Sequence, residues 1–339
     1  MTVLVTGSTG FLGMKVVERL LAHGVEHIRC FARPSSDSCR LATLASYDPA
    51  RVEVTIGNLQ NRADIDRALA GVDTVYHLAG RMTGAPAAIF RDTVVASKRL
   101  LERISTHPID RVVLASSVAV YGLAGIPADR LVDESTELEP HPERRDVYSH
   151  AKVRQELLFQ EYADRFDRDV VMLRPGPLYG PGGPAFPARV GLAVSGRLLQ
   201  FGGNNLLPLS NVLNCAEAVA LAGTSHHFSR GAYNVVDDDL PTVAEYVCRY
   251  RQEVARIRSI RCPLFAMMLL SRWAECWHVS SGGRAPLVLT PYRTTTLWRG
   301  HRFDNGKLRS TGWRQILSTR DALAGALADL RTRHEMVWS

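Results

Sequence analysis

The sequence predicts an α/β fold, with a doubly wound parallel sheet and a smaller, mostly helical C-terminal lobe. Three observations support this prediction. Short apolar runs rich in β-branched residues alternate with segments of helical period through the first half of the chain. A glycine-rich turn joins the first such run to the first helix, and a Pro/Gly-rich segment at 174–187 marks the end of the alternation. Strands that alternate with helices form parallel sheets with helices on both faces.

The expected elements follow one another in this order. A strand at 3–5 precedes a helix whose apolar residues recur with a period of 3.6, at Leu12, Val16, Val17, Leu20 and Leu21. We expect further strands at 27–32, 52–56, 74–79, 111–117 and 169–175, and helices near 62–70, 88–105 and 147–166. Beyond residue 187 the pattern is less regular, with one further strand expected at 232–236.

Composition and charge exclude several classes of protein. Of the 339 residues, 46% are hydrophobic and 22% are charged, which is typical of a globular protein rather than a disordered one. The net charge of +7 comes from arginines spread along the chain, so we expect no nucleic-acid partner. The six cysteines show no metal-binding spacing, so we expect free thiols in a reducing compartment and no metal site.

We expect a cytoplasmic protein without integral membrane association. The N-terminus "MTVLVTG" begins directly as a strand, which leaves no room for a signal peptide. The apolar segment at 262–273 is far shorter than a membrane span and is interrupted by Arg272.

The glycine-rich turn "VLVTGSTGFLG" contains Gly7, Gly10 and Gly13. The first glycine permits a tight turn, the second lets the backbone approach a pyrophosphate, and the third allows close helix–strand packing. The N-terminus of the following helix favours the anion. Because the turn lies between a strand and an amphipathic helix, we interpret it as a dinucleotide-binding loop, which makes the first domain Rossmann-type.

The end of the second strand favours NADP(H). An NAD site usually places an acidic residue there to bind the ribose 2′-hydroxyl. Here Ala32 is followed by Arg33, with Ser35 and Ser36 close behind. A guanidinium and two hydroxyls suit a 2′-phosphate, which a carboxylate would repel. NAD(H) stays the alternative, since arginine supplies 37 of the 41 basic residues and Arg33 is therefore weak evidence by itself.

The stretch "DVYSHAKVRQELL" contains Tyr148 and, four residues later, Lys152, one of only four lysines. In a helix these two side chains project from one face. Tyrosine titrates at about pH 10, and a nearby ammonium lowers that pKa toward the neutral range. The run "VLASSVAVYG" adds Ser116 and Ser117 at the C-terminal end of a strand, on the ligand side of the sheet. These residues predict a catalytic phenol assisted by an ammonium and a hydroxyl.

Most of the chain resembles the extended short-chain dehydrogenases/reductases, also called the NAD-dependent epimerase/dehydratase superfamily, and leans toward the 3β-hydroxysteroid dehydrogenase and dihydroflavonol reductase-like branch. The resemblance rests on six segments, which are "TGSTGFLG", "VYHLAG", "ASSVAVYG", "YSHAK", "LRPGPLYGPG" and the tail "FDNGKLRSTGW". Counting back four residues from Tyr121, as the pattern of this family does, makes Ser117 rather than Ser116 the catalytic hydroxyl.

The resemblance implies a mechanism. Tyr148 exchanges a proton with the substrate oxygen while hydride moves to or from nicotinamide C4. Ser117 holds that oxygen, and Lys152 lowers the tyrosine pKa and binds the nicotinamide ribose. Together with Tyr148 and Lys152, the expected cofactor contacts are Gly7, Thr9, Gly10, Phe11, Leu12, Gly13, Arg33, Ser36, Asn58, Leu59, Leu78, Ala79, Gly80, Pro175 and Gly176.

Several positions depart from the family pattern. Asn58 replaces an aspartate that contacts adenine, and Thr93 replaces an asparagine of the proton relay. Asn214 replaces a late aspartate, and we expect its role to be structural. Val118 and Ala119 stand where sugar dehydratases carry acidic residues, so dehydration is disfavoured.

We expect residues 1–180, with a return of the chain at 211–240, to form the NADP(H)-binding domain. Residues 181–339 form the interleaved substrate lobe, in which the segment 262–290 resembles a region that holds apolar carbonyl substrates, although core packing explains its side chains equally well. By family analogy we expect a homodimer through the helices at 88–105 and 147–166.

Three functions stay open from the sequence. The first is an NADP(H)-dependent oxidoreductase acting on the ketone or secondary alcohol of a small, rather apolar molecule. The second is a nucleotide-sugar epimerase or reductase with bound NAD, and the third is a non-catalytic cofactor-binding protein.

Overall fold

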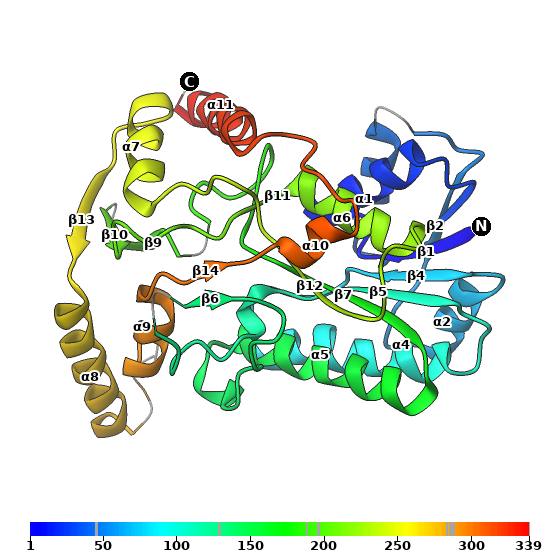
Figure 1. The fold of residues 1–339 in the computed structure, drawn as a ribbon, viewed down its shortest axis with the longest axis horizontal. Coiled ribbons are helices and arrows are strands. Elements are labelled where there is room, and N and C mark those ends of the chain that lie inside the picture. Colours follow the sequence, from blue (N-terminus) through cyan, green and yellow to red (C-terminus); the bar gives the residue numbers. More distant parts are fainter. Residues whose placement is uncertain are drawn as a thin grey trace.

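The computed structural model describes residues 1–44, 47–127, 130–187, 189–194, 197–282, 284 and 289–338. Its main body is a seven-stranded sheet in the order β12-β7-β5-β4-β1-β2-β3, with every neighbouring pair parallel (Figure 1). The strands are β1 (Thr2–Thr6), β2 (His27–Ala32), β3 (Val52–Ile56), β4 (Thr74–His77), β5 (Arg111–Ala115), β7 (Asp169–Pro175) and β12 (Gly231–Val235). The predicted doubly wound parallel sheet is confirmed, because the strand order reverses between β1 and β4.

Helices cover both faces of this sheet because its strands alternate their apolar side chains between two cores. Val113 of β5 belongs to a core with α1 (Phe11–Ala22) and α6 (Val212–Thr224). Its neighbours Val112 and Leu114 belong to a second core on the opposite face. The helices packed there are α2 (Arg62–Leu69), α4 (Ala96–Ile104) and α5 (Val147–Phe166), and Figure 1 shows α4 and α5 together on the side away from α1 and α6.

The helix expected at 88–105 is three consecutive segments. It begins as α3 (Pro86–Phe90), widens into the π-helical turn η2 (Arg91–Val95) and continues as α4. Such π-turns change the direction in which side chains project, and they are frequent near functional sites. Here the turn carries Asp92 and Thr93.

The region predicted to form the substrate lobe contains a small sheet that the sequence did not predict. Its strands are β9 (Gly191–Val194), β10 (Arg197–Phe201) and β13 (Arg258–Cys262), in the order β13-β10-β9. The main helices are α7 (Val243–Glu253), α8 (Leu264–Ser280), α9 (Pro291–Trp298) and α11 (Thr319–Trp338). The remaining short elements are η1 (Ser38–Thr43), η3 (Val118–Val120), β6 (Leu131–Val132), η4 (Pro142–Arg144), β8 (Leu178–Tyr179), β11 (Ser210–Asn211), β14 (Arg302–Phe303) and α10 (Gly306–Ser310).

In the described ranges given above, no helix combines the length and the apolar character needed to cross a bilayer. The same ranges contain no cluster of three or more His, Cys, Asp or Glu side chains able to hold a metal ion.

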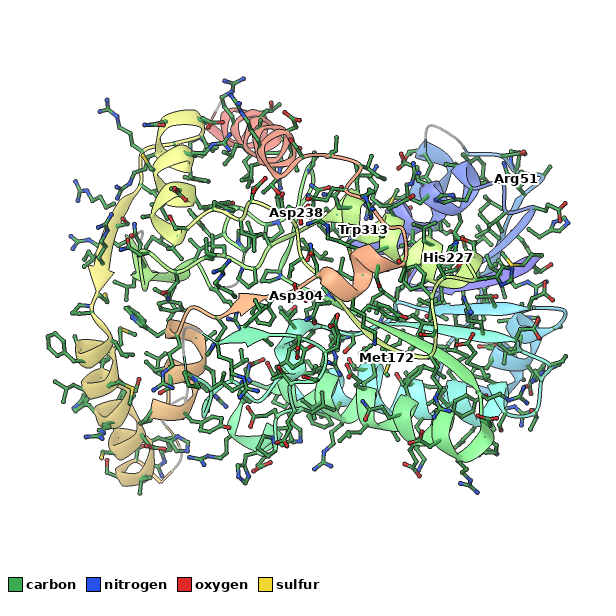
Figure 2. The ribbon with its side chains drawn as sticks, in the orientation of Figure 1. Arg51, Met172, His227, Asp238, Asp304 and Trp313 are labelled. Atoms are coloured by element: carbon green, nitrogen blue, oxygen red, sulfur yellow. The ribbon has the colours of Figure 1, made fainter. Side chains whose placement is uncertain are left out.

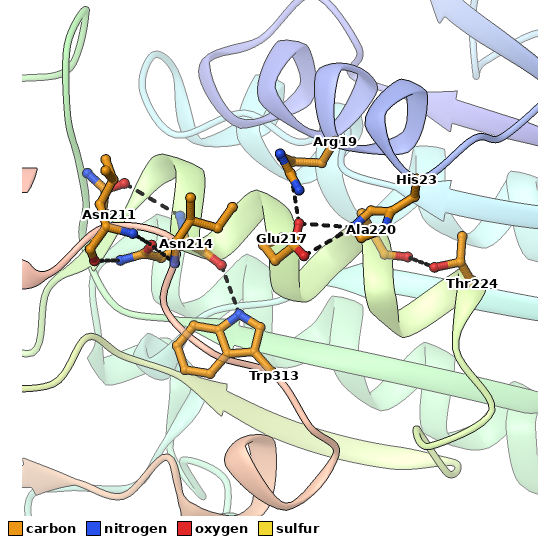
Figure 3. Close-up of polar contacts among 10 residues, drawn as sticks. Arg19, His23, Asn211, Asn214, Glu217, Ala220, Thr224 and Trp313 are labelled. Carbon is orange, nitrogen blue, oxygen red and sulfur yellow. Dashed lines mark hydrogen bonds and ion pairs between the residues drawn. The ribbon is translucent and has the colours of Figure 1, made fainter.

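The C-terminal segment returns to the first core beside α6 (Figure 3). The indole of Trp313 is buried and donates to the Asn214 carbonyl at 3.2 Å. The Asn214 side-chain oxygen accepts from the backbone N–H groups of Ile316 and Leu317, at 2.9 and 3.0 Å. Asn214 therefore has the structural role expected from the sequence, whereas the domain boundary at residue 180 stays a prediction.

Candidate active site

The loop between β1 and α1 requires glycine at two positions. Gly7 has a φ of +74°, and a Cβ placed there would lie 2.8 Å from the backbone N of Ala79. A Cβ on Gly13 would lie 2.1 Å from the Gly7 carbonyl oxygen. Gly10 caps α1 without a side-chain hydrogen bond, so the first N–H groups of the helix are available to an anion.

A cleft of about 380 Å³ opens beside this loop. It is lined by ten of the residues predicted to contact the cofactor, which are Gly7, Thr9, Gly10, Arg33, Ser36, Asn58, Leu59, Leu78, Ala79 and Gly80. The other seven predicted contacts are not part of its lining, and these are Phe11, Leu12, Gly13, Tyr148, Lys152, Pro175 and Gly176. Pro175 and Gly176 instead lie at the end of β7, next to the end of β5 that carries the serine pair.

Arginines gather around one carboxylate at the edge of this cleft. Asp92 accepts from Arg81 Nε and Arg91 Nε, each at 2.8 Å, and lies 3.6 Å from Arg33 Nη1. Partial burial opposes ionisation of Asp92, but the hydrogen bonds from Arg91 and Arg81 outweigh it and lower the pKa of that carboxyl. Three guanidinium groups therefore face one negative charge, which leaves the rim of the cleft positive.

Sequence reasoning identified only Arg33 in this group. Arg81 directly follows the "VYHLAG" segment, so its position carried a usable signal. Asp92 carried none, because it reaches the cleft through the π-turn η2.

Ser117 and Tyr148 meet at the end of β5. Ser117 caps η3, where its Oγ accepts from the Ala119 backbone N–H at 3.1 Å. Its side chain also lies near enough to the Tyr148 phenol to lower the pKa of that phenol. Tyr148 lies in the first turn of α5, which Asp146 caps by accepting from the Ser149 N–H at 3.0 Å. Ser116 is turned away, since it donates to the buried carboxylate of Glu156.

Lys152 lies one turn further along α5 and is buried, with 6% of its surface exposed. Its Nζ donates to the Ala115 carbonyl at 2.7 Å and to Gln155 Oε1 at 2.8 Å. A Cβ on Gly80, which lines the cleft, would lie 3.8 Å from this Nζ, so the ammonium lies next to the lining without being part of it. Burial lowers the pKa of Lys152 to about 8, although Glu156 opposes this shift.

The lowering of the Tyr148 pKa that the family resemblance implies is not seen in this arrangement. Burial raises the pKa of the phenol, and the hydrogen bond with Ser117 opposes that rise. The two hydrogen bonds of Lys152 instead go to the backbone of β5 and to Gln155.

A buried chain of hydrogen bonds connects the lysine with the glycine loop. Ser97 Oγ donates to the Thr93 carbonyl at 2.6 Å and therefore accepts from Gln155 Nε2 and from His77 Nε2, each at 2.8 Å. Burial lowers the pKa of His77 to about 3, so the imidazole is neutral at ordinary pH. Its Nδ1 then accepts from Thr6 Oγ1 at 2.8 Å, and the chain runs through Lys152, Gln155, Ser97, His77 and Thr6.

A buried ion pair lies next to Ser116, whose hydroxyl donates to one of its members, Glu156. Arg174 Nε donates to Glu156 Oε1 at 3.0 Å, and both side chains are at most 4% exposed. Arg174 also donates to the Tyr121 hydroxyl at 2.8 Å, and that hydroxyl donates to Asn234 Oδ1 at 2.6 Å. Sequence reasoning missed this pair, although Glu156 follows Lys152 by one helical turn.

A family model and three curated relatives are similar to the chain. The model, described as the NAD dependent epimerase/dehydratase family, matches residues 3–235. The sterol demethylase protein B of Methylococcus capsulatus is 32% identical over 53% of this chain and 52% of its own length. The uncharacterized UDP-glucose epimerase YtcB of Bacillus subtilis is 32% identical over 53% and 58%. A decarboxylating sterol-4-alpha-carboxylate 3-dehydrogenase of Candida albicans is 30% identical over 65% and 64%. The chain thus spans about half to two thirds of the length of these relatives.

Two solved structures share the fold over nearly the whole chain. The crystal structure of gox2253 has a TM-score of 0.78 at 20% identity and covers 98% of both chains. The UDP-glucose 4-epimerase of Thermus thermophilus, in complex with NAD, has a TM-score of 0.70 at 21% identity and covers 98% of this chain and 99% of its own. At such low identity the likeness establishes the fold alone.

Proposed function

Because the chain belongs to the NAD-dependent epimerase/dehydratase family, we propose that it is an oxidoreductase acting on the ketone or secondary alcohol of a small, rather apolar molecule. The observation that carries this proposal is the contact between Ser117 and Tyr148, with Lys152 one helical turn away at the border of the cleft. A hydroxyl, a phenol and an ammonium at one end of a dinucleotide cleft suit proton transfer to a carbonyl oxygen.

The residues at the cleft fit a nicotinamide dinucleotide. A side chain at Gly7 or Gly13 would collide with backbone, and the first turn of α1 offers uncapped N–H groups to a pyrophosphate. Asn58 and Leu59 would hold the adenine end, and Pro175 and Gly176 the nicotinamide end. When bound, the dinucleotide supplies the carbon that donates or accepts hydride.

Ser117, Tyr148 and Lys152 would together bind the substrate oxygen and transfer its proton. Ser117 would donate a hydrogen bond to the substrate oxygen and fix its position beside Tyr148. The Tyr148 phenol would give a proton to that oxygen in reduction and take it back in oxidation. Lys152 uses two of its three N–H bonds within the described part of the chain, so the third is available to the cofactor ribose or to the phenol.

We propose NADP(H) as the preferred cofactor. The support is the excess of guanidinium groups around Asp92, since Arg33 and Arg81 line the cleft together with Ser36. A 2′-phosphate carries the charge that such a rim attracts. Arg33→Asp should lower the preference for NADPH over NADH, as a ratio of kcat/KM, by at least about tenfold. Arg62→Asp, at an arginine outside the cleft lining, is the control, and equal ratios in both variants would contradict the assignment.

The two sterol-named relatives support an apolar substrate. Val118 and Ala119 next to Ser117 provide no acid or base for dehydration. The alternative is a nucleotide-sugar epimerase with bound NAD, which the similarity to a UDP-glucose epimerase favours.

The decisive experiment mixes the purified protein with NADPH and a panel of ketones that includes 3-ketosteroids. We expect loss of absorbance from NADPH, reduced by at least about 100-fold in Tyr148→Phe, since a positioned acid contributes about 10²–10⁴. Tyr162→Phe on the same helix is the matched control and should keep its activity.

Two outcomes would favour the other functions. Tightly bound NAD, together with turnover of UDP-sugars without net redox change, would favour the epimerase. Unchanged cellular function in a Tyr148→Phe, Lys152→Met double variant would favour a non-catalytic binding protein.

We further propose a cytoplasmic homodimer that associates through the predicted helices, which are now α3–η2–α4 and α5. Light scattering of the purified protein tests the dimer, and a monomeric mass would contradict it.

A further inference from the structure

Helix α8 carries a row of large apolar side chains that face solvent. Phe265, Leu269, Trp273 and Trp277 follow one another at intervals of four residues and are 69%, 63%, 61% and 52% exposed. Residues at this spacing lie on one face of a helix. Figure 1 shows α8 at the edge of the molecule, and Figure 2 shows side chains projecting from its outer side. The expectation that core packing explains these side chains is wrong for Phe265, Trp273 and Trp277, because most of their surface is exposed.

The opposite face of α8 is firmly packed. Met267 is buried against Phe201 of β10 and Trp298 of α9. Ser271 is fully buried, and its hydroxyl is hydrogen-bonded to that of Thr294 on α9. The rotation of the helix about its axis is thus fixed, and the apolar row is held outward. A monomer seldom presents such a continuous patch without a partner for it.

Arginines outnumber acidic residues near the row, although Glu275 is also exposed on α8. Between residues 249 and 284 the chain has seven arginines and only two acidic residues, Glu253 and Glu275. Arg258 and Arg261 are exposed on β13, the edge strand that leads directly into α8, and Arg272 is exposed on the helix itself. A second copy of this chain would bring the same positive charge to a symmetric contact, which is unfavourable. Negative charge on the partner is required instead.

We propose that α8 docks this protein onto the surface of an anionic lipid bilayer, lying in the plane of the interface. Tryptophan, phenylalanine and leucine on one face, with arginines at its border, is the pattern of interfacial helices. The apolar row would enter the boundary between headgroups and acyl chains, while Arg258, Arg261 and Arg272 face the phosphates. Such a helix lies on the membrane and does not span it.

The packed face of α8 is connected to the proposed active site through α9. Helix α8 packs on α9, and Arg293 of α9 donates to the Arg145 carbonyl at 2.9 Å. Arg145 lies three residues before Tyr148, just ahead of α5. An apolar substrate dissolved in the membrane would therefore meet the substrate lobe at the surface where the protein binds.

The test is flotation of the whole purified protein with vesicles of phosphatidylcholine, pure or mixed equally with phosphatidylglycerol. Each arginine near an anionic surface contributes about fivefold in affinity, so we expect at least about tenfold stronger binding to the mixed vesicles at low salt. High salt should reverse this preference. Brominated lipids should quench tryptophan fluorescence of the unmodified protein.

Variants locate the contact. Trp273→Ser with Trp277→Ser should weaken vesicle binding by at least about tenfold, as should Arg258→Glu with Arg261→Glu. Leu269→Ser should weaken it as well, whereas Leu157→Ser, at an exposed leucine of α5, should not. Circular dichroism and thermal unfolding verify that each variant is folded.

Three results would overturn the proposal. The first is absence of binding to the mixed vesicles, and the second is equal binding by the tryptophan double variant. The third is a dimer of the unmodified protein that the double variant converts to a monomer, because a second copy would then cover the face. The oxidoreductase activity with soluble ketones is independent of all three results, so failure here leaves the proposed function intact.

Discussion

The buried pair Arg174–Glu156 should be the most costly ion pair in this protein to break. The substitution Glu156→Gln removes one charge and leaves the guanidinium of Arg174 buried, with two neutral acceptors, the Tyr121 hydroxyl and the glutamine oxygen, as its polar partners. Two unit charges about 4 Å apart attract by about 4 kcal/mol at an effective dielectric constant of about 20. Removing one partner of a buried pair costs about 3–5 kcal/mol. Because glutamine keeps an oxygen that accepts one hydrogen bond, we expect a loss of about 3 kcal/mol at neutral pH.

The assay is chemical denaturation followed by circular dichroism. Glu253→Gln is the matched control, since it makes the same chemical change in a half-exposed ion pair with Arg249, at 2.8 Å on α7. Pairs of this kind contribute about 0.3–0.5 kcal/mol. Thermal midpoints should follow the same order, with Glu156→Gln lower by about 6 °C or more.

A difference of less than about 1 kcal/mol in free energy of unfolding between the two variants would contradict the predicted cost of breaking the buried pair. That result would mean that water or a rearranged side chain satisfies Arg174. A second readout is independent of stability, because Glu156 raises the pKa of Lys152. Its removal should therefore shift the titration of Lys152 to lower pH.

Three further outcomes are expected. Ser117→Ala should lower kcat/KM by about 10²-fold with little change in the free energy of unfolding. Ser116→Ala should keep its activity but lose about 1–3 kcal/mol in free energy of unfolding. The reverse pattern would make Ser116 the catalytic hydroxyl and Ser117 the structural one. Gly13→Ala should abolish cofactor binding measured by calorimetry, because its Cβ would lie 2.1 Å from a carbonyl oxygen. Gly325→Ala on α11, where a Cβ meets open space, should instead raise the free energy of unfolding by up to about 1 kcal/mol. Ketone reduction should decline as pH rises through about 8, where Lys152 loses its proton, and a constant kcat/KM up to about pH 10 would contradict that role.

The first half of the fold could be predicted because local sequence and tertiary structure agree there. The strands at 27–32, 52–56 and 169–175 and the helix at 147–166 match β2, β3, β7 and α5 residue for residue. In each of these segments the spacing of apolar residues favours the same secondary structure that burial against the sheet requires. The predicted cofactor loop also lies where the sequence placed it, because a Cβ at Gly7 or Gly13 would collide with neighbouring backbone.

The remainder depends on contacts between distant segments. Strand β10 pairs with β13 across about sixty residues, and no pattern within either strand indicates its partner. The π-turn that directs Asp92 toward Arg33 and Arg81 also carries no local signal. The face of α8 was misjudged because apolar residues at helical spacing are usually buried, and only the neighbouring packing shows which side is free.

The return of the C-terminal segment to α6 has a consequence for folding during synthesis. Leu308 and Trp313 are buried in the same core as β1 and α1. The side-chain oxygen of Asn214 accepts hydrogen bonds from the backbone N–H groups of residues 316 and 317. A nascent chain that ends at β12 has all seven strands of the sheet but lacks these side chains, which cover one of its faces. This apolar face therefore stays open until the ribosome has released residues 308–317, and until then it is a target for chaperones.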